Sequence, residues 1–161
     1  MSPAKPPERR VLLVRHAHAG DRTTWRGDDS LRPLSDKGWR QAEGIAAQLA
    51  GERVDRVVSS PSLRCVQTLE PLARANGVRV EEDERLLEGA DPAEALELLE
   101  SADGTWAACS HGDIIPGVLE LLGSVGARIG GQMTWPKAST WLLEGDDGAG
   151  RFARASYLPP P

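Results

Sequence analysis

The sequence is poor in cysteine and histidine and has no long hydrophobic run. Its 161 residues include two cysteines and three histidines. Two cysteines in a chain of this length do not build a disulfide framework, so we expect reduced thiols and a cytoplasmic protein. The apolar run that follows the first basic residues, 11–14, is four residues long, which is too short for a signal peptide or a membrane span.

Positive charge is outnumbered by negative charge, with 19 Lys and Arg against 24 Asp and Glu. Aromatic residues make up only 4% of the chain, and five of them are tryptophans. The net charge of −5 argues against binding to nucleic acids or anionic membranes. Apolar residues at 40% and charged residues at 27% are typical of a soluble globular protein. We predict a disordered lead-in at residues 1–9 and a single domain at 10–158, which acts as a monomer or weak homodimer.

Strand-like apolar runs alternate with amphipathic helical patterns along the chain. Strands are predicted at four apolar segments, namely 11–14, 54–58, 78–80 and 105–109. Helices are predicted at four periodic segments, namely 35–50, 61–76 (with Ser60 as N-cap and Pro61 at the first position), 91–101 and 112–123. The segments 140–143 and 151–155 flank a run rich in glycine and aspartate and predict a terminal antiparallel hairpin. The pattern indicates an α/β protein, a three-layer α/β/α sandwich around a mostly parallel sheet.

Reactive side chains follow the predicted strands. Arg15 and His16 come directly after the first strand, and His111 and Gly112 come after the fourth. Arg64 follows the second strand. Because ligands of such sheets bind beyond the carboxyl ends of the strands, we expect these residues to share one pocket. Arginine forks suit phosphate oxygens, and backbone N–H groups around Gly112 would add donors, so the sequence predicts a phosphate pocket.

A histidine in such a pocket has a chemical use. Neutral imidazole is a good nucleophile once arginines have neutralised the phosphate oxygens, so attack by His16 would give a phosphohistidine that water then hydrolyses. His111 would stabilise charge on the transferring group. The leaving group needs a proton from a carboxyl group near the pocket. This chemistry requires no metal and no cofactor.

Three sequence blocks resemble the signatures of the histidine phosphatase superfamily, the phosphoglycerate mutase-like group. The blocks are Arg15-His16-Ala17, Ser59-Ser60-Pro61 through Arg64 with Gln67-Thr68, and Ser110-His111-Gly112. The stretch from Asp28-Asp29 through Arg32-Pro33-Leu34 to Gln41 resembles the compact SixA-type branch. A closer similarity is to the histidine phosphatase domain that follows a Nudix domain in some actinobacterial MutT-type proteins. The resemblance covers about residues 11–123, and Ala17 stands where the wider family usually has glycine.

The resemblance implies that His16 is the nucleophile and that Arg15, Arg64 and His111 line the phosphate pocket. It implies a proton donor in a Leu-x-Glu pattern after the third strand, which Leu86-Leu87-Glu88 fits. Three further acids nearby leave this assignment open, namely Glu81, Glu82 and Glu84. The implied substrate is a small phosphorylated metabolite, with nucleotides such as AMP as the first choice. A SixA-type phosphohistidine protein phosphatase is the alternative. The P–N bond of phosphohistidine breaks easily without an acid, so a Glu88 that can donate a proton favours ester substrates.

Two functions from other classes remain as rivals. One is a metal enzyme that uses four ligands, His16, His18, His111 and Asp113. Neighbouring arginines argue against it, because guanidinium groups repel cations and the sequence has no Glu-x-x-His pair. The other is a non-catalytic protein that binds a phosphate ligand, which the complete set of pocket residues disfavours.

Several loop residues are candidates for substrate contacts beyond the phosphate group. His18 would border the pocket. Three arginines would reach further phosphates or pair with Asp28 and Asp29, namely Arg22, Arg26 and Arg32. Trp25 and Trp135 would stack on a nucleobase, or pack as ordinary aromatic residues. Small polar residues near the pocket are interpreted as caps and turn formers, namely Ser59, Ser60 and Thr68, and Cys65 and Cys109 as buried small apolar residues.

Overall fold

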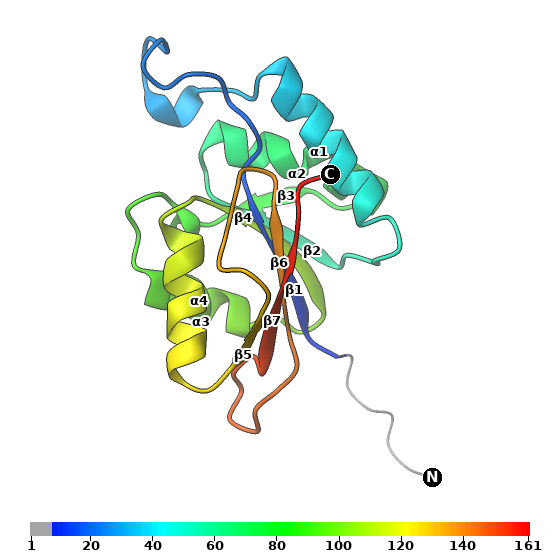
Figure 1. Ribbon diagram of the computed structural model, residues 1–161. Coiled ribbons are helices and arrows are strands. Elements are labelled where there is room, and N and C mark those ends of the chain that lie inside the picture. Colours follow the sequence, from blue (N-terminus) through cyan, green and yellow to red (C-terminus); the bar gives the residue numbers. More distant parts are fainter. Residues whose placement is uncertain (1–7) are drawn as a thin grey trace.

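Residues 8–161 of the computed structural model are described here, and they form a seven-stranded mixed sheet between two layers of helices (Figure 1). The strands are β1 (Arg10–Arg15), β2 (Arg56–Ser59), β3 (Val80–Glu82), β4 (Thr105–Ser110), β5 (Arg128–Gly130), β6 (Thr140–Glu144) and β7 (Arg154–Leu158). The helices are α1 (Asp36–Gln48), α2 (Leu63–Ala75), α3 (Pro92–Glu100) and α4 (Ile114–Ser124), with short 3₁₀ turns η1 (Asp29–Leu31) and η2 (Glu84–Leu86). The predicted lead-in at residues 1–9 falls, for its first seven residues, outside the described part.

The sheet has the order β3-β2-β4-β1-β6-β7-β5. The β3–β2, β2–β4, β4–β1 and β5–β7 pairs are parallel, and β6 pairs antiparallel with both β1 and β7. The predicted α/β class, the mostly parallel sheet and the antiparallel hairpin near the C-terminus are therefore confirmed.

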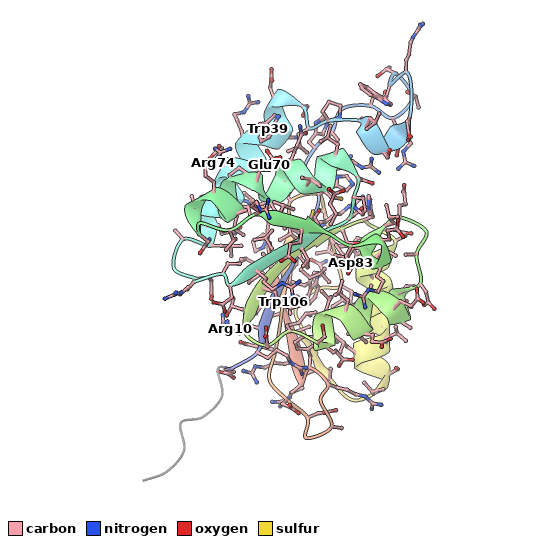
Figure 2. All side chains as sticks on the ribbon, turned by 180° about the vertical axis from the view of Figure 1, so that it is seen from behind. Arg10, Trp39, Glu70, Arg74, Asp83 and Trp106 are labelled. Carbon is pink, nitrogen blue, oxygen red and sulfur yellow. The ribbon has the colours of Figure 1, made fainter. Side chains whose placement is uncertain are left out.

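Alternation along β1 shows how one strand supports two helical layers. Val11 and Leu13 face a core built with α3 and α4, whereas Leu12 and Val14 face a core built with α1 and α2. All four side chains are almost completely buried, as expected for a central strand covered on both faces. The α1–α2 layer is also seen in Figure 2, where Trp39 of α1 lies near Glu70 and Arg74 of α2. No helix within residues 8–161 has the length and apolar character needed to cross a bilayer.

Several element boundaries differ from the sequence prediction. For example, β2 begins at Arg56 rather than at 54, and α4 begins at Ile114 rather than at 112. Helix α2 begins at Leu63 rather than at Pro61, because the Ser60 hydroxyl bonds to His111 and Ser62 precedes the helix. Strand β7 begins at Arg154 rather than at 151, because the carboxylates of the preceding aspartate-rich turn accept backbone N–H groups as far as Arg151. Strand β3 lies two residues later than predicted, where Val80 pairs with Val57 of β2.

The parallel strands place their carboxyl ends at one edge of the sheet. β1 ends at Arg15, β2 at Ser59 and β4 at Ser110, and the segments that follow are joined there by backbone hydrogen bonds. The His16 N–H donates to the Ser110 carbonyl at 3.1 Å, and the Ser60 N–H donates to the Cys109 carbonyl at 3.0 Å. Figure 2 shows Arg10, at the start of β1, far from Asp83, which follows the end of β3. The functional residues predicted after the strands therefore meet at this edge.

Candidate active site

A cavity of about 460 Å³ opens at the carboxyl ends of β1 and β4. Its lining residues are Arg15, His16, Gly20, Arg22, Arg32, Glu88, His111, Gly112, Asp113, Trp135 and Lys137. Arg64 lies beside this lining, with its Nη2 3.6 Å from the Glu88 Oε2. The structure thus brings together the five residues predicted to be catalytic.

His16 is buried in this cavity, with 6% of its surface exposed. Its Nδ1 lies 2.9 Å from the Ala17 carbonyl oxygen. A carbonyl oxygen only accepts, so Nδ1 carries the proton and Nε2 keeps its lone pair. The pKa of His16 is lowered to about 3, mainly by burial. The hydrogen bond to Ala17 raises this pKa, whereas the charges of His111, Arg64 and Arg15 contribute to lowering it. The imidazole is therefore neutral near pH 7, and its Nε2 carries no proton, which is the state in which this nitrogen could act as a nucleophile.

Two hydrogen-bond bridges hold the His16 segment in place. The Thr68 hydroxyl accepts from the Ala17 N–H at 2.9 Å and donates to the Arg64 carbonyl at 2.6 Å, which joins the end of β1 to the first turns of α2. The Ala138 N–H is shared between the carbonyls of Arg15 and His16, at 3.1 and 3.3 Å. Thr68, interpreted from the sequence as a turn former, thus fixes the His16 segment relative to the start of α2, which carries the buried Arg64.

The second histidine, His111, is 1% exposed and faces His16 edge-on, with ring centroids 5.5 Å apart. Its Nε2 lies 2.8 Å from the Ser60 hydroxyl and 3.5 Å from the Cys65 thiol. Its Nδ1 is buried without a hydrogen-bond partner among residues 8–161. Ser60 orients His111, a role missed when Ser60 was assigned as a helix cap. Its place at the end of β2, on the same edge as His16, was the available signal.

Arg15 reaches the cavity over Gly112. Its Nη1 donates to the Trp135 carbonyl at 2.9 Å, and burial lowers its pKa while Asp113 and Glu88 oppose that shift. A Cβ atom added to Gly112 would lie 2.8 Å from both Cζ and Nη2 of Arg15. Such a contact is closer than side chains tolerate, so the guanidinium occupies the space left by the missing side chain. Gly112 therefore gives Arg15 its position.

Arg64 is almost completely enclosed, with 1% of its surface exposed. Its Nη1 donates to the Asp29 carbonyl at 2.9 Å, and its Nη2 forms an ion pair with the Asp29 carboxylate at 3.2 Å. The same carboxylate accepts from the Arg32 Nε at 3.1 Å and lies 3.8 Å from the Arg22 Nε. Asp29, on η1, thus gathers three arginines at the cavity. Sequence reasoning had placed it in the SixA-like pattern without giving it this role.

Glu88 lines the cavity, as does Asp113, and it is the one of the four candidate proton donors that does so. Its carboxylate is 3.0 Å from the Arg22 Nη2 and within ion-pair distance of Arg64. The alternative acids do not line the cavity, and Glu81 instead pairs with Arg56 at 2.8 Å on the exposed surface. The turn η2 reverses the chain after β3 and carries Leu86 into the core. Glu88 then lies beside Arg22 and Arg64 at the cavity.

Residues 11–97 match the sequence profile of the histidine phosphatase superfamily (branch 1), a segment that is over half of the chain. The chain belongs to this superfamily. A curated relative, the 8-oxo-(d)GTP phosphatase of Mycolicibacterium smegmatis, is 37% identical over 158 residues, which cover 94% of this chain and 48% of that protein. Phosphoserine phosphatase 1 of Hydrogenobacter thermophilus is 34% identical over 80 residues, which cover 49% of this chain and 38% of that protein. The chain thus spans about half, or less, of the curated relatives it matches.

Solved structures give the same family and fold. SixA of Agrobacterium tumefaciens is 25% identical, with a TM-score of 0.71, and the match covers 96% of this chain and 99% of that one. The protein histidine phosphatase SixA in complex with tungstate has the same TM-score at 21% identity, over 93% and 94% of the two chains. The predicted membership, including the similarity to the SixA-type branch and to MutT-type proteins, is confirmed.

In this histidine phosphatase, two predicted loop contacts lie outside the cavity. His18 is held away from it, with Nδ1 2.6 Å from the Ser35 hydroxyl and its N–H bonded to Gln41. Trp25 lines a neighbouring, smaller hollow of about 220 Å³, which shares Gly20 and Arg32 with the cavity. Its Nε1 donates to the Asp28 carbonyl at 3.0 Å.

The alternative of a metal enzyme requires a cluster of ligands. Among residues 8–161 there is no group of three or more His, Cys, Asp or Glu side chains that could hold a metal ion. His18, one of its four expected ligands, is hydrogen-bonded to Ser35. Arg15 and Lys137 instead line the cavity as positive groups. The charge that surrounds His16 and His111 suits an anion.

Proposed function

We propose that this histidine phosphatase is a metal-independent phosphomonoesterase that works through a phosphohistidine on His16. The observation that carries the proposal is a neutral imidazole whose Nε2 keeps its lone pair inside a buried, arginine-lined cavity. Residues 10–158 would form one catalytic domain. The substrate would be a small nucleotide, with AMP or another nucleoside monophosphate as the first choice.

In the first step, Arg15 and Arg64 bind the phosphoryl oxygens and neutralise their charge. The His16 Nε2 lone pair forms a bond to phosphorus, and the bond from phosphorus to the ester oxygen breaks. The electron pair of that bond stays with the leaving oxygen, which takes a proton from the Glu88 carboxyl group. The buried Nδ1 of His111 would donate to a phosphoryl oxygen, while Ser60 holds the other side of the ring.

In the second step, the phosphohistidine is hydrolysed. The Glu88 carboxylate takes a proton from a water molecule as the water oxygen attacks phosphorus. The bond from phosphorus to Nε2 breaks, its electron pair returns to His16, and inorganic phosphate leaves. The hydrogen bond from Nδ1 to the Ala17 carbonyl keeps Nε2 as the reacting nitrogen in both steps.

Two observations support a nucleotide as the substrate. The relative that covers 94% of this chain is named an 8-oxo-(d)GTP phosphatase. The cavity of about 460 Å³ is also within the range of sites for whole small molecules, which is about 300–1,000 Å³, and the Trp25 hollow adjoins it. A phosphoryl group alone would fill only a small part of this space.

A second candidate, a phosphohistidine protein phosphatase, is supported by the likeness to SixA at 25% identity over nearly the whole chain. Glu88 separates the two functions. The Glu88→Gln variant should lose about 10²-fold in kcat/KM on an alkyl phosphate ester, because the leaving alkoxide loses its proton donor. Hydrolysis of a phosphohistidine peptide should fall much less. Unchanged ester hydrolysis in this variant would contradict the proton-donor role.

The covalent step is tested by trapping. Protein quenched in alkali during turnover of a ³²P-labelled ester should carry label on histidine, since phosphohistidine survives alkali but not acid. His16→Ala should abolish both label and turnover, and the matched control His18→Ala should retain both. Hydrolysis by His16→Ala, or turnover without label, would overturn the proposal. The metal rival predicts that EDTA removes the activity, whereas we expect full activity after EDTA treatment.

A further inference from the structure

Lys137 is a cavity residue that the proposed phosphoryl transfer does not use. It lies on the segment that leads into β6, and it lines the cavity together with Arg15 and Arg32. Within residues 8–161 its ammonium group has no hydrogen-bond or ion-pair partner. Partial burial lowers its pKa, and the positive charges of four cavity arginines, Arg15, Arg32, Arg22 and Arg64, lower it further. A cation placed among cations and without a carboxylate partner is a mark of an anion-binding site.

The backbone next to Lys137 is constrained to hold this position. Ala138, which follows it, is fully buried and adopts a φ of 68°, the only positive φ found for a non-glycine residue in the described part of the chain. Its N–H is bonded to the carbonyls of Arg15 and His16. Strained backbone of this kind persists only where the surrounding structure imposes it. The same bonds that fix the nucleophile therefore place Lys137 at the cavity.

Arg32 offers a second unused donor. It is 5% exposed, its Nε is bonded to Asp29 and its Nη1 to the Ala19 carbonyl at 2.7 Å. Its Nη2 has no hydrogen-bond partner among residues 8–161. By contrast, the acids of the cavity are already engaged, since Glu88 pairs with Arg22 and Asp113 accepts from the Gly89 N–H. The Lys137 ammonium group and the Arg32 Nη2 donor are thus available to a ligand, although the Arg32 guanidinium also pairs with Asp29.

We propose that Lys137 and Arg32 form a second anion subsite beside the His16 pocket, which binds a second phosphate carried by the leaving group, as in a nucleoside diphosphate. The inference rests on the proposed function and, among the nucleotides proposed there, favours a diphosphate over the monophosphate that was the first choice. With such a substrate, the bond that breaks joins the terminal phosphorus to the bridging oxygen, and the nucleoside monophosphate leaves with the electron pair. Arg15 and Arg64 hold the phosphate that is transferred, and Lys137 holds the phosphate that stays on the leaving group.

The subsite is tested by binding, independently of turnover. Calorimetric titrations with inorganic phosphate and with pyrophosphate would be compared for the wild type, Lys137→Met and the matched control Lys37→Met, which changes an exposed lysine at the start of α1. In Lys137→Met we expect pyrophosphate affinity to fall at least tenfold and phosphate affinity to change less than threefold. Lys37→Met should change neither affinity.

Other results of these titrations would overturn the proposal. An equal loss for both ligands would mean that Lys137 contacts the transferred phosphate. Unchanged pyrophosphate affinity would mean that it contacts neither. A failure of the proposed function looks different, because the wild type would then bind pyrophosphate through Lys137 but hydrolyse no phosphate ester or nucleotide. For an active enzyme, the ratio of kcat/KM for a nucleoside diphosphate to that for the monophosphate should fall about tenfold in Lys137→Met.

Discussion

The closest steric fit in the candidate site, Gly112 against the Arg15 guanidinium, gives the sharpest prediction. A methyl group in Gly112→Ala would lie 2.8 Å from the Cζ and Nη2 of Arg15 and 3.1 Å from its Nε. The atoms in the way are the far end of a flexible side chain, so the guanidinium moves and the backbone does not. Gly112 has no positive φ, so alanine brings no backbone strain. The variant should fold normally but hold Arg15 out of position.

The size of the effect follows from the bonds that Arg15 would lose. A hydrogen bond to a charged group contributes about 1.5–3 kcal/mol, and a displaced guanidinium loses one such bond or weakens two. This corresponds to a fall in kcat/KM of about 10- to 100-fold. The assay is hydrolysis of an aryl phosphate, with the melting temperature of the same samples measured by calorimetry. We expect the melting temperature to change by less than about 2 °C. The control is Gly51→Ala, because no atom lies within 4 Å of a Cβ added there.

A double-mutant cycle shows whether the effect passes through Arg15. In an Arg15→Ala background the space is empty, so Gly112→Ala should change kcat/KM by less than twofold. If it instead causes the full loss in that background, Gly112 acts through its own backbone N–H and the steric explanation is wrong. Wild-type activity in a normally folded Gly112→Ala single variant would refute the reasoning outright.

Three further predictions concern stability and the second histidine. In Gly38→Ala the new Cβ would collide with the backbone carbonyl of His18, and backbone cannot move aside as a side chain can. Calorimetry should therefore show a melting temperature lower by about 5 °C or more. A melting temperature equal to that of the wild type would contradict this packing. Ser60→Ala should lower kcat/KM about tenfold and also lower the melting temperature, because His111 loses the shorter of the two contacts of its Nε2 and that bond is buried. An unchanged rate would remove Ser60 from the site. The folded pKa of His16, about 3, lies below the 6.5 of the unfolded chain, so its contribution is complete above pH 6.5 and is lost as the pH falls toward 3. Urea unfolding at pH 7.5 and 5 should show the wild type losing about 2 kcal/mol more than His16→Asn, and equal losses would show that His16 titrates normally.

Much of the fold was predictable because its long elements obey local rules. Val11–Val14 is a continuous apolar run, as a strand buried on both faces requires, and α3 begins where Asp91 and Pro92 predicted its cap. The short strands obey longer-range constraints. β5 consists of Arg128, Ile129 and Gly130, has no apolar pattern of its own, and exists because it pairs in parallel with β7 about 26 residues later.

The candidate site likewise contains residues whose position follows from local sequence patterns and residues whose position depends on long-range contacts. Arg15 ends β1, and His16 and His111 directly follow strands, so the parallel topology alone predicts that they meet. Ser60 follows a strand too, but its sequence context also fits a helix cap, and only its distance to His111 decides between the two roles. Lys137 lies in an irregular segment without periodicity. It reaches the cavity through the bonds that the Ala138 N–H makes to the end of β1, which no pattern in the sequence encodes.

The charges of the site serve nucleophile and substrate together. Burial is the main cause of the low pKa of His16, and the charges of His111, Arg64 and Arg15 lower it further, which keeps its Nε2 free of a proton. In the proposed mechanism the two arginines would also attract the phosphate that Nε2 attacks. Once a dianionic phosphoryl group is bound, its charge offsets those cations, so protonation of the imidazole is opposed less in the complex than in the free enzyme. The Nδ1 hydrogen bond to Ala17 then matters most, because it keeps the ring turned so that Nε2 faces phosphorus whichever charge the imidazole carries. In the proposed mechanism, geometry and charge would thus act at different stages, with burial and charge keeping His16 unprotonated before binding and the Ala17 carbonyl holding its ring during transfer.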